Sequence, residues 1–228
     1  MADYGAYILM DNGNPFVTPY STPFCLYNRS EVASNTNGSA AIDIPVDPSY
    51  PAIAFCRVSG PSQAVYLGVR RNGSVISASA STPAGYTGSK TFTLTVYVFA
   101  VFPQPLPQWG IAFWDASGRV VLTNESRVLT DLVTVGTPGA GGINLDVTLS
   151  GSYAVAPGIL GSSLWQTSQG GQPVIINVTA YTGCYFNGIT TRFWPVGNQI
   201  SGGTPAGGTT TGITLTAINT AAYDKLIV

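Results

Sequence analysis

The side chains that could carry out chemistry are few in this sequence. Histidine is absent, the only lysines are Lys90 and Lys225, and ten carboxylates are scattered along the chain. General acid–base and nucleophilic catalysis mostly use histidine, so this chain would have to use carboxylate, lysine, tyrosine or cysteine groups. No Gly-x-Ser-x-Gly motif and no paired acidic motif brings such groups together. We therefore expect a protein that is not an enzyme, a glycosidase with two distant carboxylates being the remaining enzymatic alternative.

The three cysteines, Cys25, Cys56 and Cys184, have no C-x-x-C spacing. Zinc sites use clusters of cysteine and histidine, and calcium sites use loops rich in aspartate, and the sequence has neither pattern. We expect no metal and no cofactor. An odd number of cysteines argues against a disulfide framework, so the sequence predicts buried, reduced thiols and synthesis in a reducing cytoplasm. A bond between Cys25 and Cys56 stays open.

Three patterns resemble functional motifs but have simpler explanations. Asp43 and Asp47 lie in Ala41–Asp47, where apolar and polar residues alternate as in a half-buried strand. Residues four apart on a strand are about 13 Å apart, too far to act as a catalytic pair. The segment GYTGSKT at 85–91 lacks the spacing of a phosphate-binding loop. Arg70-Arg71 is interpreted as ordinary edge-strand charge, with an anion site as the alternative.

The composition indicates a folded, weakly charged protein. Only 8% of residues are charged and the net charge is −1, whereas 45% are hydrophobic and 11% aromatic. A basic surface for nucleic acid or acidic membranes is therefore not expected. The first ten residues lack the pattern of a signal peptide, and the longest apolar run, Leu94–Phe102, is about half the length of a membrane helix. A surface with so little charge suggests that neighbouring subunits cover it.

A hairpin motif occurs twice in the chain. In Trp109–Leu129, two apolar runs flank the turn Asp115–Gly118. The aspartate can accept hydrogen bonds from the turn backbone, and the glycine can adopt positive φ. The earlier copy begins at Tyr4-Gly5. Three elements of the second copy follow their counterparts at one constant spacing: Trp109-Gly110 after Tyr4-Gly5, Gly118 after Gly13, and Thr123 after Thr18. The repeat indicates a duplicated domain.

Further repeats set the predicted domain boundaries. Ile42–Tyr50 corresponds to Leu145–Tyr153, with Ser-Tyr at the end of each, and Pro173–Thr179 occupies the place of Phe92–Phe99. The segment at 103–108, with three prolines, is typical of a stiff linker. We predict a first β-sandwich-like domain at 1–102, a Pro-rich linker at 103–108, a second such domain at 109–200 and a Gly/Thr-rich C-terminal extension at 201–228.

Short strands separated by turns are expected throughout. Beyond those named above, the sequence predicts strands at 52–57, on both sides of Asn72-Gly73, and at 91–99. A loop is expected at 77–90, a flexible connection at 201–212, a short strand at 213–218, and a terminus at 221–228 that docks on a neighbouring unit or frays. No window has helical periodicity. The predicted fold class is all-β, with two tandem, similar, antiparallel β-sandwich-like domains.

The duplicated Tyr/Trp-Gly hairpin, the strand ending in Thr95–Phe99, and the linker into Trp109-Gly110 resemble a family of tail-associated virion proteins of tailed bacteriophages. The resemblance covers roughly 4–197 and leaves the Gly/Thr-rich C-terminus outside. It implies a structural component of the distal tail or a tail fibre, made in the host cytoplasm, that assembles as an oligomer with itself and with other tail proteins. It brings no catalytic residues.

Two alternatives to a structural tail component remain. The first is a receptor-binding module that grips a host surface glycan or protein with exposed aromatic side chains, the candidates being Trp165, Tyr185 and Trp194. Burial of these aromatic residues in a sandwich core would instead favour the structural role. The second alternative is a capsid decoration protein on the head surface.

Overall fold

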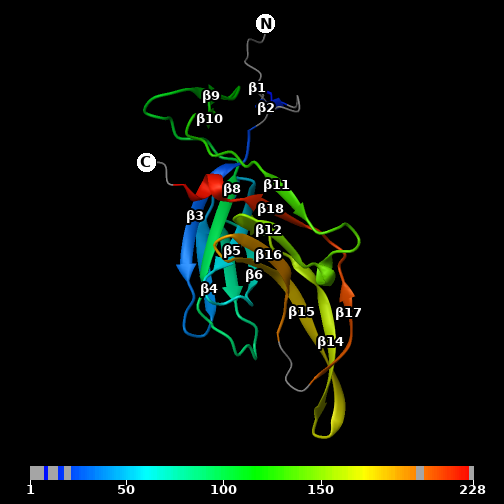
Figure 1. Ribbon diagram of the computed structural model, residues 1–228. Coiled ribbons are helices and arrows are strands. Elements are labelled where there is room, and N and C mark those ends of the chain that lie inside the picture. Colours follow the sequence, from blue (N-terminus) through cyan, green and yellow to red (C-terminus); the bar gives the residue numbers. More distant parts are fainter. Residues whose placement is uncertain (1–7, 10–14, 18–21, 199–202, 226–228) are drawn as a thin grey trace.

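The protein is built almost entirely of short β-strands. The computed structural model describes residues 8–9, 15–17, 22–198 and 203–225 (Figure 1). The strands of the first half are β1 (Ile8–Leu9), β2 (Pro15–Val17), β3 (Cys25–Ala33), β4 (Ser39–Pro45), β5 (Ala52–Ser59), β6 (Tyr66–Asn72), β7 (Val75–Ser81) and β8 (Thr93–Ala100). The predicted all-β class is confirmed.

The second half adds ten strands and two short helical turns. These are β9 (Ala112–Trp114), β10 (Val120–Thr123), β11 (Leu132–Val135), the 3-10 turn η1 (Gly142–Asn144), β12 (Val147–Ser150), β13 (Tyr153–Val155), β14 (Ile159–Gln169), β15 (Gln172–Phe186), β16 (Thr190–Val196), β17 (Thr204–Thr210), β18 (Leu215–Asn219) and α1 (Ala221–Asp224). Within the described ranges, no helix is long and apolar enough to cross a membrane.

The two halves repeat one topology. In the first half, β8 lies between β3 and β5 and is antiparallel to both. In the second half, β18 lies in the same way between β11 and β13. In each half, the last strand (β8 or β18) therefore lies between an early strand (β3 or β11) and the strand that begins at or just after the Ser-Tyr motif (β5 or β13). By topology the counterpart of β8 is β18, so the correspondence predicted between Pro173–Thr179 and Phe92–Phe99 is wrong.

The two three-stranded sets join into one sheet. Cys56 of β5 lies opposite Val155 of β13 in an antiparallel bridge. The end of β15 also runs parallel to β5, with Tyr185 beside Val58. The strands β11, β18, β13, β5, β8 and β3, in that order, form a continuous sheet across both halves. β15 branches from β5 and pairs with β14 and β16, and β17 pairs with β14.

One hydrophobic core serves both halves. The small sheet β4-β7-β6 packs its apolar face against β5 and β8. The same cluster of buried residues includes Val155, Cys184 and Phe193 of the second half. Two separate sandwich-like domains are thus not confirmed, because strands from both predicted domains share a sheet and a core. The division at 103–108 marks the start of a hairpin lobe.

The predicted C-terminal extension is part of the fold. Thr204–Thr210, expected to be a flexible connection, is strand β17 and pairs along β14. The predicted short strand is β18, which is flanked by β11 and β13. The helical turn α1 packs Tyr223 against Phe99 of the first half, with ring centroids 4.9 Å apart. The last described residues therefore dock, and they dock on the opposite half of the same chain.

Turn chemistry explains where the hairpins reverse. Asp115 Oδ1 accepts hydrogen bonds from the backbone N–H groups of Ser117 and Arg119, both 2.9 Å away, and Gly118 has a φ of 77°. The predicted reversal between β9 and β10 is confirmed on the residues that were expected to make it. The Asn72-Gly73 turn between β6 and β7 is confirmed too. The loop expected from Ser77 onward is wrong in its first part, because β7 continues to Ser81.

The three cysteines are free and buried. Burial raises the pKa of the Cys25 thiol to about 11 and that of Cys56 to about 12, and it also raises that of Cys184. Because the thiolate is the reactive form, a thiol reagent at pH 8 should label no cysteine in the native protein and three after denaturation. Rapid labelling of the native protein would contradict the buried positions. The prediction of reduced, apolar cysteines is confirmed, and Cys25 and Cys56 are not bonded.

Candidate functional site

The charged side chains mostly support the backbone. Asp47 accepts hydrogen bonds from the hydroxyl and the backbone N–H of Ser49, and these lower the pKa of its carboxyl. Arg71 donates to the carbonyl oxygens of Asp47, Pro48 and Tyr50. One residue of the supposed carboxylate pair, Asp47, and one of the basic spot, Arg71, therefore stabilise the same turn. No group of three potential metal ligands occurs in the described part of the chain.

One polar network connects the C-terminus to the first half. Asp224 accepts hydrogen bonds from Tyr97, Thr220, Arg29 and Arg57. Burial raises the pKa of Tyr97 to about 12. Burial would also raise the pKa of Asp224, but hydrogen bonds from Tyr97 and Thr220 and the charge of Arg57 lower it on balance. A phenol and a carboxylate in these states do not exchange protons near neutral pH, so the network is structural.

The three aromatic candidates do not form one site. Trp165 of β14 lies opposite Ile176 of β15, whereas Trp194 of β16 lies opposite Gly183 of β15. Ile176 and Gly183 are an odd number of residues apart on the same strand, so the two tryptophans project from opposite faces. The Trp194 ring lies 5.0 Å from the guanidinium of Arg192, and Tyr185 donates a hydrogen bond to the carbonyl oxygen of Gly60. Both therefore pack against the protein's own residues.

Trp165 lines an open groove. The groove has a volume of about 640 Å³ and lies on the inner face of β14 and β15, beside the end of β16. Its lining residues are mostly apolar or small: Ile143, Ser163, Trp165, Val178, Ala180, Pro195, Gly197 and Asn198. The indole N–H of Trp165 donates to Ser163 Oγ at 2.9 Å, which holds the half-buried ring in place at the edge of the groove. We refer to this feature as the Trp165 groove.

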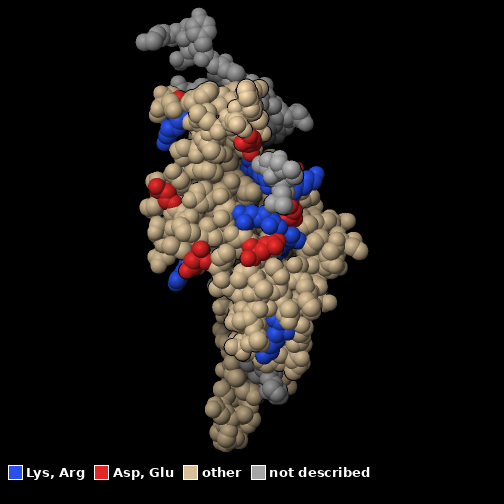
Figure 2. Space-filling view, turned by 90° about the vertical axis from the view of Figure 1, so that its left-hand side faces the viewer, with Lys and Arg blue, Asp and Glu red and all other residues tan. Residues whose placement is uncertain are grey.

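The groove lies at the base of a projecting arm. The arm, residues 162–178 of the β14–β15 hairpin, runs to the lower end of Figure 1, and its part beyond Gln166, where β17 stops pairing with β14, extends past the sheets. No charged residue occurs between Asp146 and Arg192. Figure 2 shows the lower end of the molecule without charged side chains, while blue and red groups gather higher on that face. The arm is therefore uncharged and offers amide, hydroxyl and apolar groups.

A second exposed feature was not anticipated from the sequence. The hairpin lobe, residues 103–128, contains β9 and β10 as a separate two-stranded sheet at the opposite end of the molecule from the arm (Figure 1). Its own core is small, with Val121 and Leu122 buried. Its large apolar side chains are exposed, namely Leu106 (64%), Trp109 (82%), Ile111 (63%) and Trp114 (53%). A usable signal was present, since a two-stranded hairpin has too little interior to bury two tryptophans.

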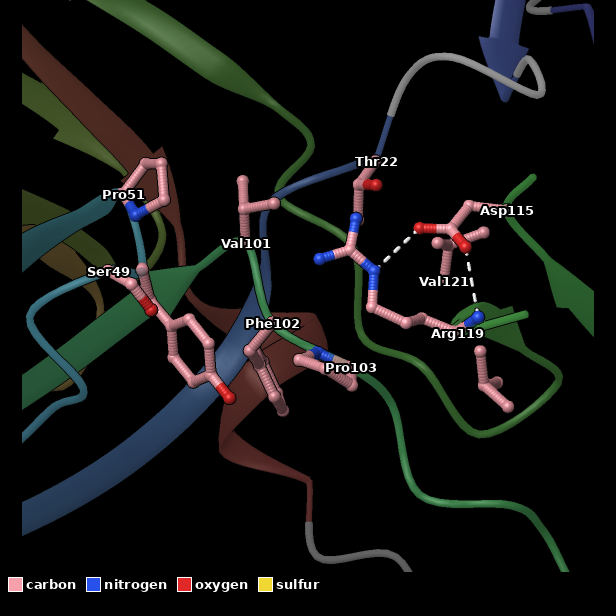
Figure 3. Close-up of a pocket in the computed structure, with 11 residues that line it drawn as sticks. Thr22, Ser49, Pro51, Val101, Phe102, Pro103, Asp115, Arg119 and Val121 are labelled. Atoms are coloured by element: carbon pink, nitrogen blue, oxygen red, sulfur yellow. Dashed lines mark hydrogen bonds and ion pairs between the residues drawn. The ribbon is translucent and has the colours of Figure 1, made fainter. Parts of the chain in front are cut away.

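A small pocket separates the hairpin lobe from the main sheets (Figure 3). It measures about 270 Å³ and is lined on the lobe side by Asp115 and Arg119, and on the other side by residues such as Tyr50 and Phe102. Arg119 Nε donates to Asp115 Oδ2 at 2.8 Å, and hydrogen bonds to Arg119 and Ser117 lower the pKa of the Asp115 carboxyl. The Asp115 carboxylate already accepts hydrogen bonds within its own turn, so it is not available as a general base. We interpret the pocket as a gap between the lobe and the main sheets.

Comparison with known proteins finds no matching family model, no matching curated protein and no matching solved structure.

Proposed function

We propose that this protein is a structural subunit of a bacteriophage tail and that it assembles with copies of itself through the hairpin lobe. The observation that carries the proposal is the exposure of Leu106, Trp109, Ile111 and Trp114 within nine residues of one small lobe. Several large, exposed apolar side chains on one small lobe mark an interaction site in a soluble protein. The tail assignment draws on the resemblance of the duplicated hairpins to tail-associated virion proteins.

The hairpin lobe has the composition of an interface. Tryptophan is enriched among residues that dominate binding energy, and charged residues are depleted from interface cores. No charged residue occurs between Lys90 and Asp115, so the apolar part of the lobe is neutral. Three charged groups of the lobe are engaged within the protein, since Arg119 pairs with Asp115 and Arg127 donates to the carbonyl oxygens of Tyr223 and Lys225. The favoured role is therefore assembly, and catalysis has no comparable support.

Light scattering on the purified protein tests this proposal. We expect a defined oligomer, and we expect Trp109→Glu to be a monomer at the same concentration. An interfacial tryptophan contributes at least about 2 kcal/mol, so its loss weakens association roughly 30-fold or more. Ile189→Glu is the matched control, since Ile189 is 75% exposed but lies outside the lobe. A wild-type protein that stays monomeric would refute self-assembly, and labelled antibodies that find it nowhere on phage tails would refute the tail assignment.

One observation favours receptor binding as a second candidate. The Trp165 groove combines an aromatic ring with an uncharged arm rich in hydroxyl and amide groups, a combination that suits a neutral glycan. Trp194 and Tyr185 do not contribute to it, so the predicted three-residue cluster is reduced to Trp165. Binding of the wild-type protein to neutral host glycans, lost in Trp165→Ala, would support this candidate over the first.

A further inference from the structure

Two apolar features that the described residues leave open lie at opposite ends of the molecule. The hairpin lobe, which contains β9 and β10 at one end of Figure 1, exposes large apolar side chains, and the Trp165 groove is lined by residues of β14 and β15, which run toward the other end. The lobe offers exposed apolar side chains, and the groove offers a hollow that such a side chain can enter. No described residue of the same chain fills the groove or covers the exposed Trp109.

The size and lining of the groove suit an aromatic side chain. Its volume of about 640 Å³ lies in the range of pockets that enclose drug-sized ligands, about 300–1,000 Å³, so it has room for a large side chain and its neighbours. Val178, Ala180 and Pro195 provide apolar walls. Trp165 provides a ring on which an indole can stack, an arrangement that aromatic pairs favour.

We propose that the hairpin lobe of one copy docks into the Trp165 groove of a second copy, in a head-to-tail contact. This inference rests on the proposed self-assembly and names the surface that receives the lobe. Trp109, the most exposed of the large apolar residues, enters the groove and packs on Trp165. Ile111 and Trp114 extend the contact along the neighbouring surface.

Two properties favour a second copy of the chain as the occupant of the groove: neither surface is charged, and one type of contact covers both surfaces. The exposed apolar residues of the lobe lie in 91–114, which contains no charged residue, and none of the residues that line the groove is charged. Docking one on the other therefore opposes no like charges and leaves no ionised group without its water. A symmetrical lobe-to-lobe contact would cover the lobe and leave the groove open, whereas one head-to-tail contact covers both. Such contacts produce a closed ring or a filament.

Mixing two defective variants tests the head-to-tail arrangement. Trp109→Glu disables the lobe, and Ser163→Lys places a charge in the groove. Each variant alone should be monomeric. An equimolar mixture should form a heterodimer of twice the monomer mass, because the intact groove of the first variant can accept the intact lobe of the second. Light scattering and equilibrium sedimentation measure this, and circular dichroism verifies that each variant is folded.

A second pair of variants guards against misfolding and non-specific effects. Pro195→Lys introduces a positive charge into the groove from β16 and should behave as Ser163→Lys does. If one of the two variants does not fold, the other can be used in the mixing experiment. Ile175→Lys is the control on the arm. Ile175 is 56% exposed, and it projects from the face opposite Ile176 and Trp165, so this variant should assemble as the wild type does.

The outcomes separate this inference from the proposal on which it rests. A mixture that forms heterodimers supports head-to-tail docking. If the wild type is oligomeric but the mixture stays monomeric, or if the groove variants assemble normally, the docking inference is wrong and self-assembly stands. If the wild type is monomeric at all concentrations, self-assembly itself is wrong.

Discussion

Replacing Asp224 with alanine is expected to destabilise the protein by about 2–4 kcal/mol. The carboxylate accepts hydrogen bonds from Tyr97, Thr220 and two arginines, and the side chain of Arg57 is only 9% exposed. Removing one partner of a buried ion pair leaves the other charge uncompensated, which costs about 3–5 kcal/mol when both are fully buried. We expect somewhat less because Asp224 retains 26% exposure. Chemical denaturation monitored by circular dichroism measures the change.

The exposed ion pair of Asp146 and Arg192 provides the matched control. Their side chains are 57% and 49% exposed, so Asp146→Ala should change the free energy of unfolding by less than about 1 kcal/mol. Equal losses in the two variants would contradict a special role for the Asp224 network.

The same network predicts a pH dependence. The pKa of Asp224 in the folded protein is lower than the ordinary value of 3.8. A carboxyl with a depressed folded-state pKa stabilises the protein fully above its unfolded-state pKa, and this stabilisation disappears as the pH falls through the folded-state value. The stability difference between wild type and Asp224→Ala should therefore be constant above about pH 5 and shrink below pH 3.8. A difference that stays constant at lower pH would show that the carboxylate charge is not responsible.

Local signals in the sequence predict the hairpins well. Asp115 and Gly118, and likewise Asn72-Gly73, have side chains or backbone freedom that act within the turn itself. The alternation in Ala41–Asp47 likewise depends only on the strand's own two faces, and β4 lies there. Such signals are readable because the partners that satisfy them are close in sequence.

The pairing of strands between the two halves could not be predicted from such local sequence signals. The contact of Cys56 with Val155 and the parallel pairing of Tyr185 with Val58 join residues of the two halves that are far apart in sequence, and no pattern in the sequence marks them. Strand β17, Thr204–Thr210, has a composition typical of flexible segments, and its pairing along β14 decides its structure. The sequence repeat predicts the shared topology, but it does not show that the repeats share one core.

The same limit applies to the candidate site. The aromatic residue types were visible, but whether Trp165 and Trp194 face one way depends on the register of three strands. A difference of one residue in register moves a side chain to the opposite face. The sequence does predict the hairpin that carries Trp109 and Trp114, but their exposure also requires that β9 and β10 remain a two-stranded sheet, which is a tertiary property.

A core substitution in the second half should therefore destabilise the first half as well. Phe193 of β16 is fully buried in the cluster that includes Val96 and Val98 of β8. Phe193→Ala is expected to cost about 3–5 kcal/mol through lost burial and the cavity that remains. Because the core is shared, unfolding should stay a single transition, and slowly exchanging amides of β3 and β8 should lose protection by the same free energy as those of β16.

Hydrogen exchange resolved by strand distinguishes this from two independent domains. If each half had its own core, Phe193→Ala would leave the protection of β3 and β8 unchanged, and a second unfolding transition would appear. The conservative variant Phe193→Leu provides the control, since it keeps most of the buried volume and should cost less than about 1.5 kcal/mol. Equal loss of protection on both sides of the β5–β13 junction would show that the duplicated topology folds as one cooperative unit, because the interior that stabilises each half contains residues of the other.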